Sequence, residues 1–226
     1  MQPFSPDLPK TGIPNGSPVG GPKEKKLDRS LRRQYQASDF LAQQGYHVIN
    51  NPKTDPPKDK VRANADPDFR IEGIIFDCYT PDPPLQAQHK ARQDVFGLTE
   101  PSSEFDFSWD DDPQVQSQID TKTKSLVCDS IRKQVMGKIH DAQAFSIVLN
   151  LTDVCKTVTS EEVGKMLKDR GVEKLERVLI VAPREGAIPT TPCVNKEQFR
   201  LDDVSYDVYQ EPEYALADLT VTDVKL

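Results

Sequence analysis

The sequence of 226 residues predicts an α/β (α+β) fold, in which helices flank a mixed central sheet. Three observations support this prediction. An apolar pattern of helical period runs over residues 27–44. Residues 69–79 alternate around Glu72-Gly73 as in an antiparallel hairpin. Two apolar strands, 144–151 and 177–182, are separated by a helical stretch, which is the spacing of a right-handed parallel crossover.

The first half of the chain begins with the helix. Leu27, Leu31, Tyr35 and Ser38 recur on one side of it, and Gly45 ends it. Residues 46–50 then read as a strand, and residues 51–60, which contain three prolines, as a loop.

The second half carries two more helices. Residues 119–142 place apolar side chains at helical spacing. A helix opening at Thr159 is marked by Glu162, which completes a capping box, and Gly171 closes it. Between the hairpin and the first of these helices, residues 85–118 read as a long acidic surface insertion, without evident structure.

Composition divides the chain into three parts. Hydrophobic residues make up only 36%, so we expect part of the chain not to pack. Residues 1–26 are a linker, and their first 22 positions contain six prolines, which is typical of extended, disordered segments. Residues 27–183 form the predicted domain, and residues 184–226 an acidic C-terminal extension.

The net charge of -7 argues at first against a nucleic-acid partner. Its distribution changes that interpretation. Residues 93–121 carry -8 and residues 184–226 carry -5, whereas residues 1–33 carry +4. The remaining core carries +2, so the acidity belongs to the insertion and the extension. The charge therefore does not exclude an RNA substrate.

Several classes of site are disfavoured. No apolar run approaches the ~20 residues of a membrane helix, and the N-terminus lacks the pattern of a signal peptide. The four cysteines are spread singly, which disfavours a zinc site or a disulfide framework. No phosphate-binding glycine loop is present.

Two carboxylates stand on the two arms of the predicted hairpin. A turn at Glu72-Gly73 pairs positions whose numbers sum to about 145, so Asp68 and Asp77 can lie opposite each other. Side by side they could hold a hard divalent cation such as magnesium, and a nearby lysine would complete a phosphate-cleaving site.

Four segments in this order extend the pattern: LAQQGYHVINNP, DPDFRIEGIIFDCYTP, KIHDAQAFSIVLNL and LERVLIV. Together they resemble the PD-(D/E)XK nuclease superfamily. Within it, they resemble the C-terminal tRNA nuclease domains of CdiA proteins, the toxin tips of bacterial contact-dependent growth inhibition. The resemblance covers roughly residues 31–182, interrupted by the insertion.

The resemblance implies roles for particular residues. Asp68 and Asp77 would be metal ligands, with magnesium as the expected ion. Lys138 would be the basic residue of the site, moved from the strand onto the following helix, and Gln143 would match a polar position at the end of that helix. Gln36 stands where relatives often have a glutamate, which puts metal affinity or activity in question.

A second departure lies on the strand after Gln143, where Ser146 replaces an arginine that relatives tend to have. Individual residues also have plainer interpretations. Asp68 fits a turn after Pro67, and Lys138 fits an exposed helix face.

The function implied is a metal-dependent endoribonuclease toxin domain that cleaves tRNA. It would be secreted or displayed at the cell surface as the C-terminal part of a larger bacterial effector, act in the target-cell cytoplasm, and bind a cognate immunity protein. Basic residues at the start of the first helix could contact phosphates: Lys25, Lys26, Arg29, Arg32 and Arg33.

Two alternatives remain open. The same metal chemistry could act on DNA, because nothing in the residues separates the two substrates. The chain could also be a catalytically silent binding module of the same fold, an interpretation that Gln36 and Ser146 favour.

Overall fold

The computed structural model describes residues 7–21, 28–97, 112–190, 195–201, 204–209 and 212–226. Its strands are β1 (Val48–Asn50), β2 (Phe69–Ile71), β3 (Ile74–Tyr79), β4 (Ser146–Asn150), β5 (Arg177–Pro183), β6 (Asn195–Leu201), β7 (Val204–Tyr209) and β8 (Leu219–Lys225). Its helices are α1 (Arg29–Gln43), α2 (Pro56–Asp59), α3 (Leu85–Phe96), α4 (Pro113–His140), α5 (Ser160–Asp169) and the 3-10 turn η2 (Leu216–Asp218).

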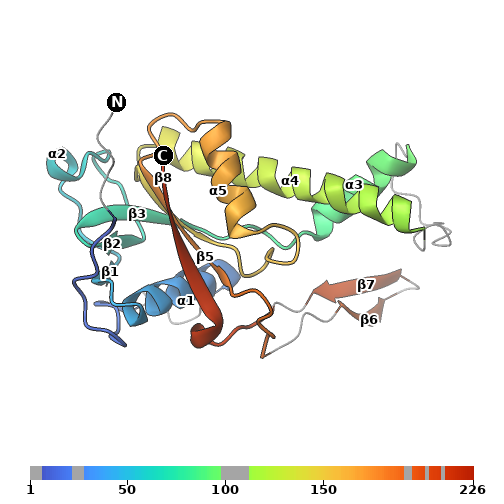
Figure 1. Ribbon diagram of the computed structural model, residues 1–226, viewed down its shortest axis with the longest axis horizontal. Coiled ribbons are helices and arrows are strands. Elements are labelled where there is room, and N and C mark those ends of the chain that lie inside the picture. The colour runs from blue at the N-terminus through green and yellow to red at the C-terminus, as the bar shows by residue number, and fades with distance from the viewer. Residues whose placement is uncertain (1–6, 22–27, 98–111, 191–194, 202–203, 210–211) are drawn as a thin grey trace.

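Six of these strands form a mixed sheet in the order β1-β2-β3-β4-β5-β8. The pairs β3·β4 and β4·β5 are parallel, and the other three pairs are antiparallel. Helices cover both faces (Figure 1). The predicted mixed α/β architecture is therefore confirmed.

Each face of the sheet has its own apolar core. Phe40 and Leu41 of α1 pack against Phe69, Phe76 and other side chains on one face. On the opposite face, α4 and α5 pack over a second cluster, which includes the fully buried Ile131, Ile147, Leu149, Val163 and Leu167. Because side chains alternate along a strand, neighbouring residues of β3 and β4 belong to different cores.

The predicted hairpin is formed by β2 and β3. Its two turn residues, Glu72 and Gly73, have φ values of 49° and 83°. Two positive φ values in a two-residue loop match the right-handed twist of an antiparallel pair. The register pairs Phe69 with Phe76 and Ile71 with Ile74, so the partner numbers sum to 145 as the sequence predicts.

The predicted crossover is also present. It runs from β4 through α5 to β5, and β4 and β5 pair in parallel. The capping box at the start of α5 is complete, because the Thr159 side chain accepts from the Glu162 backbone and the Glu162 side chain accepts from the Thr159 backbone. Local capping signals were sufficient to place this helix boundary.

The expected insertion at 85–118 is more structured than predicted. It contains the whole of α3, and α4 begins at Pro113 rather than at 119. Asp112 caps α4 by accepting from the backbone of Gln114. Residues 98–111 of the insertion lie outside the described residues. The short helix α2 likewise occupies part of the stretch predicted as a loop.

The N-terminal segment is ordered where it is described, which corrects the expectation of disorder for residues 7–21. Leu8 is buried in the core beneath α1. Val19 forms a parallel bridge with Ile49 at the edge of the sheet. Thr11 donates through its backbone to Glu72 at 2.8 Å, which ties the segment to the hairpin turn.

The C-terminal extension also contributes to the domain. Its last strand, β8, pairs with β5 over seven residues, so the sheet continues beyond residue 183. Strands β6 and β7 form a separate two-stranded hairpin. Within the described part of the chain, no helix is both long and apolar enough to cross a membrane.

A pair of leucine substitutions tests whether β8 belongs to the folded core. Leu219 has only 1% of its surface exposed, whereas Leu226 is 41% exposed. Leu219→Ala should lower the free energy of unfolding by about 2–5 kcal/mol, because it leaves a cavity in a packed core. Leu226→Ala should cost less than about 1 kcal/mol. Urea unfolding measures both values, and equal small effects would show that β8 does not pack as described.

Candidate functional site

The structure brings Asp68, Asp77 and Lys138 together. Asp77 lies in the middle of β3, and Asp68 directly precedes β2, opposite it in the hairpin register. Phe69 and Phe76, the next residues along these strands, face α1. Alternation therefore directs both carboxylates to the other face, on which α4 carries Lys138.

Hydrogen bonds hold this carboxylate pair. Lys138 Nζ donates to Asp77 Oδ2 at 2.8 Å. The backbone N–H of Cys78 donates to Asp68 Oδ2 at 2.7 Å and to Asp77 Oδ1 at 3.1 Å. One strand amide therefore bridges the two acids, while one ammonium group pairs with the more deeply buried of them.

Lys138 reaches the pair because of its place on α4. It lies in the last turn of the helix, one residue before the buried Ile139 and three after the buried Val135. At that position the stem follows the apolar face while the charged end extends past it, and 26% of the side chain remains exposed. A cation in the last turn is also favoured by the helix dipole.

The electrostatics of the pair are those of two acids that cannot both ionise easily. The side chain of Asp77 is only 3% exposed. Burial, followed by the hydrogen bond and the charge of Asp77, raises the pKa of Asp68 from 3.8 to about 8. Asp68 therefore retains a proton near neutral pH while Asp77 pairs with Lys138. Strongly perturbed carboxyl groups of this kind are typical of functional sites.

The donor set of the pair fits a divalent cation of the magnesium type. Magnesium is commonly held by one or two carboxylates, with water and substrate phosphate oxygens completing its shell. A cation between Asp68 and Asp77 would replace the proton that now relieves their repulsion. Among the described residues, no group of three or more His, Cys, Asp or Glu side chains gathers as a ready-made metal cage. The two carboxylates are thus the ligands that the protein offers here.

Gln36 is not part of this group, which corrects the expectation from the resemblance. It lies on α1, across the sheet from Asp77. Its side-chain oxygen accepts from Arg33 at 3.1 Å, and its amide nitrogen contacts the Tyr214 carbonyl at 3.5 Å. A position on α1 can approach the α1 face of β3 but not the face that carries Asp77.

Two other positions from the resemblance lie near the start of β4. Gln143 is half-buried in the turn between α4 and β4, and no described hydrogen bond joins its side chain to the carboxylate pair. Ser146 is buried as the first residue of β4 and lies in register with Arg177. An arginine at position 146 of this chain would therefore lie beside Arg177, a residue of the same charge on the adjacent strand.

Two of the arginines at the basic start of α1 have acidic partners within the protein. Arg33 is buried and donates to Asp153 Oδ1 from Nη2 at 2.6 Å. Arg29 donates to Asp153 Oδ2 from Nε at 2.8 Å and to Asp82 from Nη1 at 2.9 Å. Both predicted contacts are therefore used inside the protein. Arg32 is exposed, and Lys25 and Lys26 lie outside the described residues.

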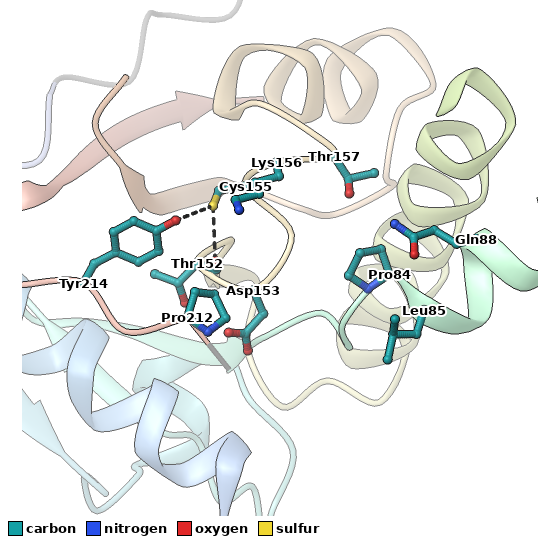
Figure 2. A pocket seen from close by; sticks show the side chains of 10 residues that line it. All are labelled: Pro84, Leu85, Gln88, Thr152, Asp153, Cys155, Lys156, Thr157, Pro212 and Tyr214. Atoms are coloured by element: carbon teal, nitrogen blue, oxygen red, sulfur yellow. Dashed lines mark hydrogen bonds between the residues drawn. The ribbon is translucent and has the colours of Figure 1, made fainter. Parts of the chain in front are cut away.

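Asp153, the acceptor of both arginines, also lines a cavity of about 130 Å³ beyond the end of β4 (Figure 2). Figure 2 shows Tyr214 on one side of this cavity and Pro84 on the other. The Tyr214 hydroxyl lies 3.3 Å from Cys155 Sγ, whose pKa is raised by burial. A raised pKa keeps more of this half-buried thiol in its protonated, less nucleophilic form.

The proton on Asp68 gives a testable pH dependence. Its native pKa lies above its ordinary value, so the native state binds more protons than the unfolded state between about pH 4 and pH 8. The stabilisation is complete below pH 4 and is lost as the pH rises through 8. In the absence of divalent cations, the wild type should lose more than about 1 kcal/mol of stability over this range relative to Asp68→Asn.

Urea unfolding at pH 5 and pH 8 measures this difference. Asp141→Asn is the matched control, because its side chain is 61% exposed and close in sequence to Lys138. The control should keep the wild-type slope. A wild type and an Asp68→Asn variant with parallel pH profiles would show that Asp68 does not hold the proton.

Comparisons with known proteins identify a sequence relative and a similar structure. No family model matches the chain. The chain is 35% identical over 79 residues to tRNA nuclease CdiA-2 of Burkholderia pseudomallei (strain 1026b), a match that covers 34% of this chain and 2% of the relative. A solved CdiA-CT/CdiI toxin and immunity complex from Burkholderia pseudomallei aligns with a TM-score of 0.46 and 21% identity. That alignment covers 73% of this chain and 91% of the other.

The chain spans only a small fraction of the curated relative it matches, so that protein's activity does not transfer by itself. The predicted resemblance to CdiA is confirmed as a similarity in sequence over 79 residues. The narrower assignment to the PD-(D/E)XK superfamily stays a prediction.

Proposed function

We propose that this chain is a metal-dependent nuclease of the toxin type, whose site is built on Asp68, Asp77 and Lys138. The observation that carries the proposal is the convergence of these three side chains. Lys138 of α4 donates to Asp77 of β3, and the Cys78 amide donates to both Asp77 and Asp68, the residue before β2. Two carboxylates that can hold a divalent cation, together with a nearby ammonium group, suit the cleavage of a phosphodiester bond. The sequence similarity to a protein named a tRNA nuclease supports the same conclusion.

Each residue has a chemical task in this proposal. Asp68 and Asp77 would hold a magnesium ion, which neutralises phosphate charge and orients water when bound. The Cys78 amide fixes both carboxylates, so that their oxygens are already directed before substrate arrives. Lys138 is paired with Asp77, and its exposed end can donate a hydrogen bond or a proton to an oxygen of the phosphate.

The biological setting is part of the proposal. The domain would be delivered as the C-terminal part of a larger bacterial effector and act in the target-cell cytoplasm on tRNA. A cognate immunity protein would protect the producing cell. The similarity to CdiA-2 supports this setting, because that relative is far longer than this chain.

Cleavage of tRNA is the first test. Purified protein with magnesium should cleave tRNA, and chelation of the metal should stop cleavage. Asp77→Asn, Asp68→Asn and Lys138→Met should each lower the rate by at least about 100-fold, because each removes a group that positions or stabilises the reacting phosphate. Gel analysis of labelled tRNA measures the rates.

The control for this test is again Asp141→Asn, which should cleave at the wild-type rate. Thermal unfolding must show that the variants remain folded. Parallel reactions with duplex DNA separate the two substrate classes. Cleavage of DNA alone would replace the RNA proposal, and cleavage of neither would favour a silent binding module.

Metal binding is a second test that does not depend on activity. Because Asp68 holds a proton at neutral pH, magnesium should release that proton on binding. Calorimetric titration at pH 7 in two buffers of different ionisation enthalpy should therefore give different heats. Asp68→Asn should abolish the difference, and Asp77→Asn should weaken binding at least about tenfold. Heats that do not depend on the buffer would contradict the assigned ligands.

A further inference from the structure

The segment 51–67, which joins β1 to β2, is hydrogen-bonded near its two ends to the backbone of elements that carry the candidate site. The backbone N–H of Asn51 donates to the carbonyl of Asp68 at 2.8 Å. At the other end, the backbone N–H of Arg62 donates to the carbonyl of Ala142 at 3.0 Å. Ala142 follows Lys138 by four residues in the turn after α4. The segment thus connects to both elements that supply the site.

Apolar packing holds the part of the segment around Val61 against the sheet. Val61 is 7% exposed and forms a small cluster with Ile75 and Ala144. Ile75 lies two residues before Asp77 on β3, so both side chains face the same side of the sheet. Residues 60–62 are therefore held over the face that carries the carboxylates.

An ion pair fixes the outer part of the segment. Arg70 of β2 donates from Nη1 and Nη2 to the two carboxylate oxygens of Asp59 at 2.9 and 2.8 Å. Arg70 also donates to the carbonyl of Lys53 at 3.0 Å. The hydrogen bond with Arg70 holds the pKa of Asp59 below its usual range, so this acid is neutralised in place. A bidentate pair of this kind restrains the backbone on both sides of it.

What remains exposed on the segment is mainly positive. Lys53, Lys58, Lys60 and Arg62 are exposed, against the exposed Asp55 and Asp66. Lys60 Nζ approaches Glu176 only at 3.9 Å, and both side chains are more than half exposed, so this contact does not remove the charge of Lys60. A rigid, basic rim therefore borders a site whose own carboxylates would repel a phosphate backbone.

We propose that segment 51–67 binds the sugar–phosphate backbone of the nucleic-acid substrate. Lys58, Lys60 and Arg62 would contact phosphates next to the one that is cleaved. This inference rests on the function proposed above. It moves the nucleic-acid surface from the start of α1, where Arg29 and Arg33 are engaged by Asp153, to the loop between β1 and β2. Arg70 acts as a positioning residue that holds the loop in place.

Equilibrium binding without added metal tests the proposal in the full chain. The variant Lys60→Gln/Arg62→Gln removes two positive charges from the segment. The control Lys165→Gln/Lys168→Gln removes two exposed positive charges from α5. Gly164 of α5 packs beside Val224 and Ile180, so this helix covers β5 and β8 at the far end of the sheet from β2.

For tRNA at 0.1 M salt, the segment variant should bind about 10-fold more weakly than the wild type. The slope of log Kd against log salt concentration should fall by about 1.5, the value for two lost phosphate contacts. The α5 control should keep the wild-type affinity and slope. A duplex DNA of similar charge, titrated in parallel, shows whether the contact is shared by both nucleic acids.

The outcomes separate the two proposals. If wild-type protein binds tRNA, and the segment variant and the α5 control change affinity equally, the segment is not the binding element and the inference is wrong. If the wild type binds neither tRNA nor DNA, the proposed function itself is wrong. Thermal unfolding of both variants confirms that the change of charge has not altered the fold.

Discussion

The two-residue turn at Glu72-Gly73 is the constraint on which the site depends. Both residues have positive φ, so the loop length and the register are fixed together. That register places Asp68 opposite Asp77, and alternation sends both to the face covered by α4. A slip of one residue would turn one of the two acids toward the core beneath α1 and so separate the pair. The raised pKa of Asp68 and its shared amide at Cys78 both follow from this pairing.

Two of the buried ion pairs of the described residues lie on opposite faces of the sheet, beside β3 and β4. Lys138 pairs with Asp77 beneath α4, and Arg33 pairs with Asp153 near the start of α1. The two differ in what is left exposed. The side chain of Lys138 is 26% exposed, and its partner Asp77 shares an amide donor with a second acid. Arg33 is only 6% exposed, and the side chain of Asp153, which is 0% exposed, pairs with both Arg33 and Arg29. The first arrangement is open to solvent at Lys138, and the second fixes α1 to the end of β4.

Local signals predicted most of the fold and the carboxylate pair. Some elements are determined by residues that are close together in the sequence, and these could be predicted from it. They are the turn at Glu72-Gly73, the capping box at Thr159 and the apolar strand 144–151. The hairpin register then predicted that Asp68 and Asp77 lie opposite each other. In an antiparallel hairpin the numbers of paired residues have a constant sum, which the position of the turn sets. The strand β8 was missed because its apolar residues alternate weakly and its partner β5 lies some forty residues away.

Gln36 was expected beside the carboxylate pair and Arg33 at a phosphate-binding surface, and the structure places neither there. Both positions depend on tertiary packing, which cannot be predicted from neighbouring residues in the sequence. Helix α1 packs on Phe69 and Phe76, so it lies across the sheet from the acids that Gln36 was expected to join. Arg33 looks like a surface residue until Asp153, 120 residues later, is placed beside it. The same reasoning explains why charge counted along the chain was a poor guide to a nucleic-acid surface. Two arginines of α1 are paired with a tertiary partner, Asp153. On segment 51–67 the exposed basic residues outnumber the exposed acids, because Arg70 pairs with Asp59.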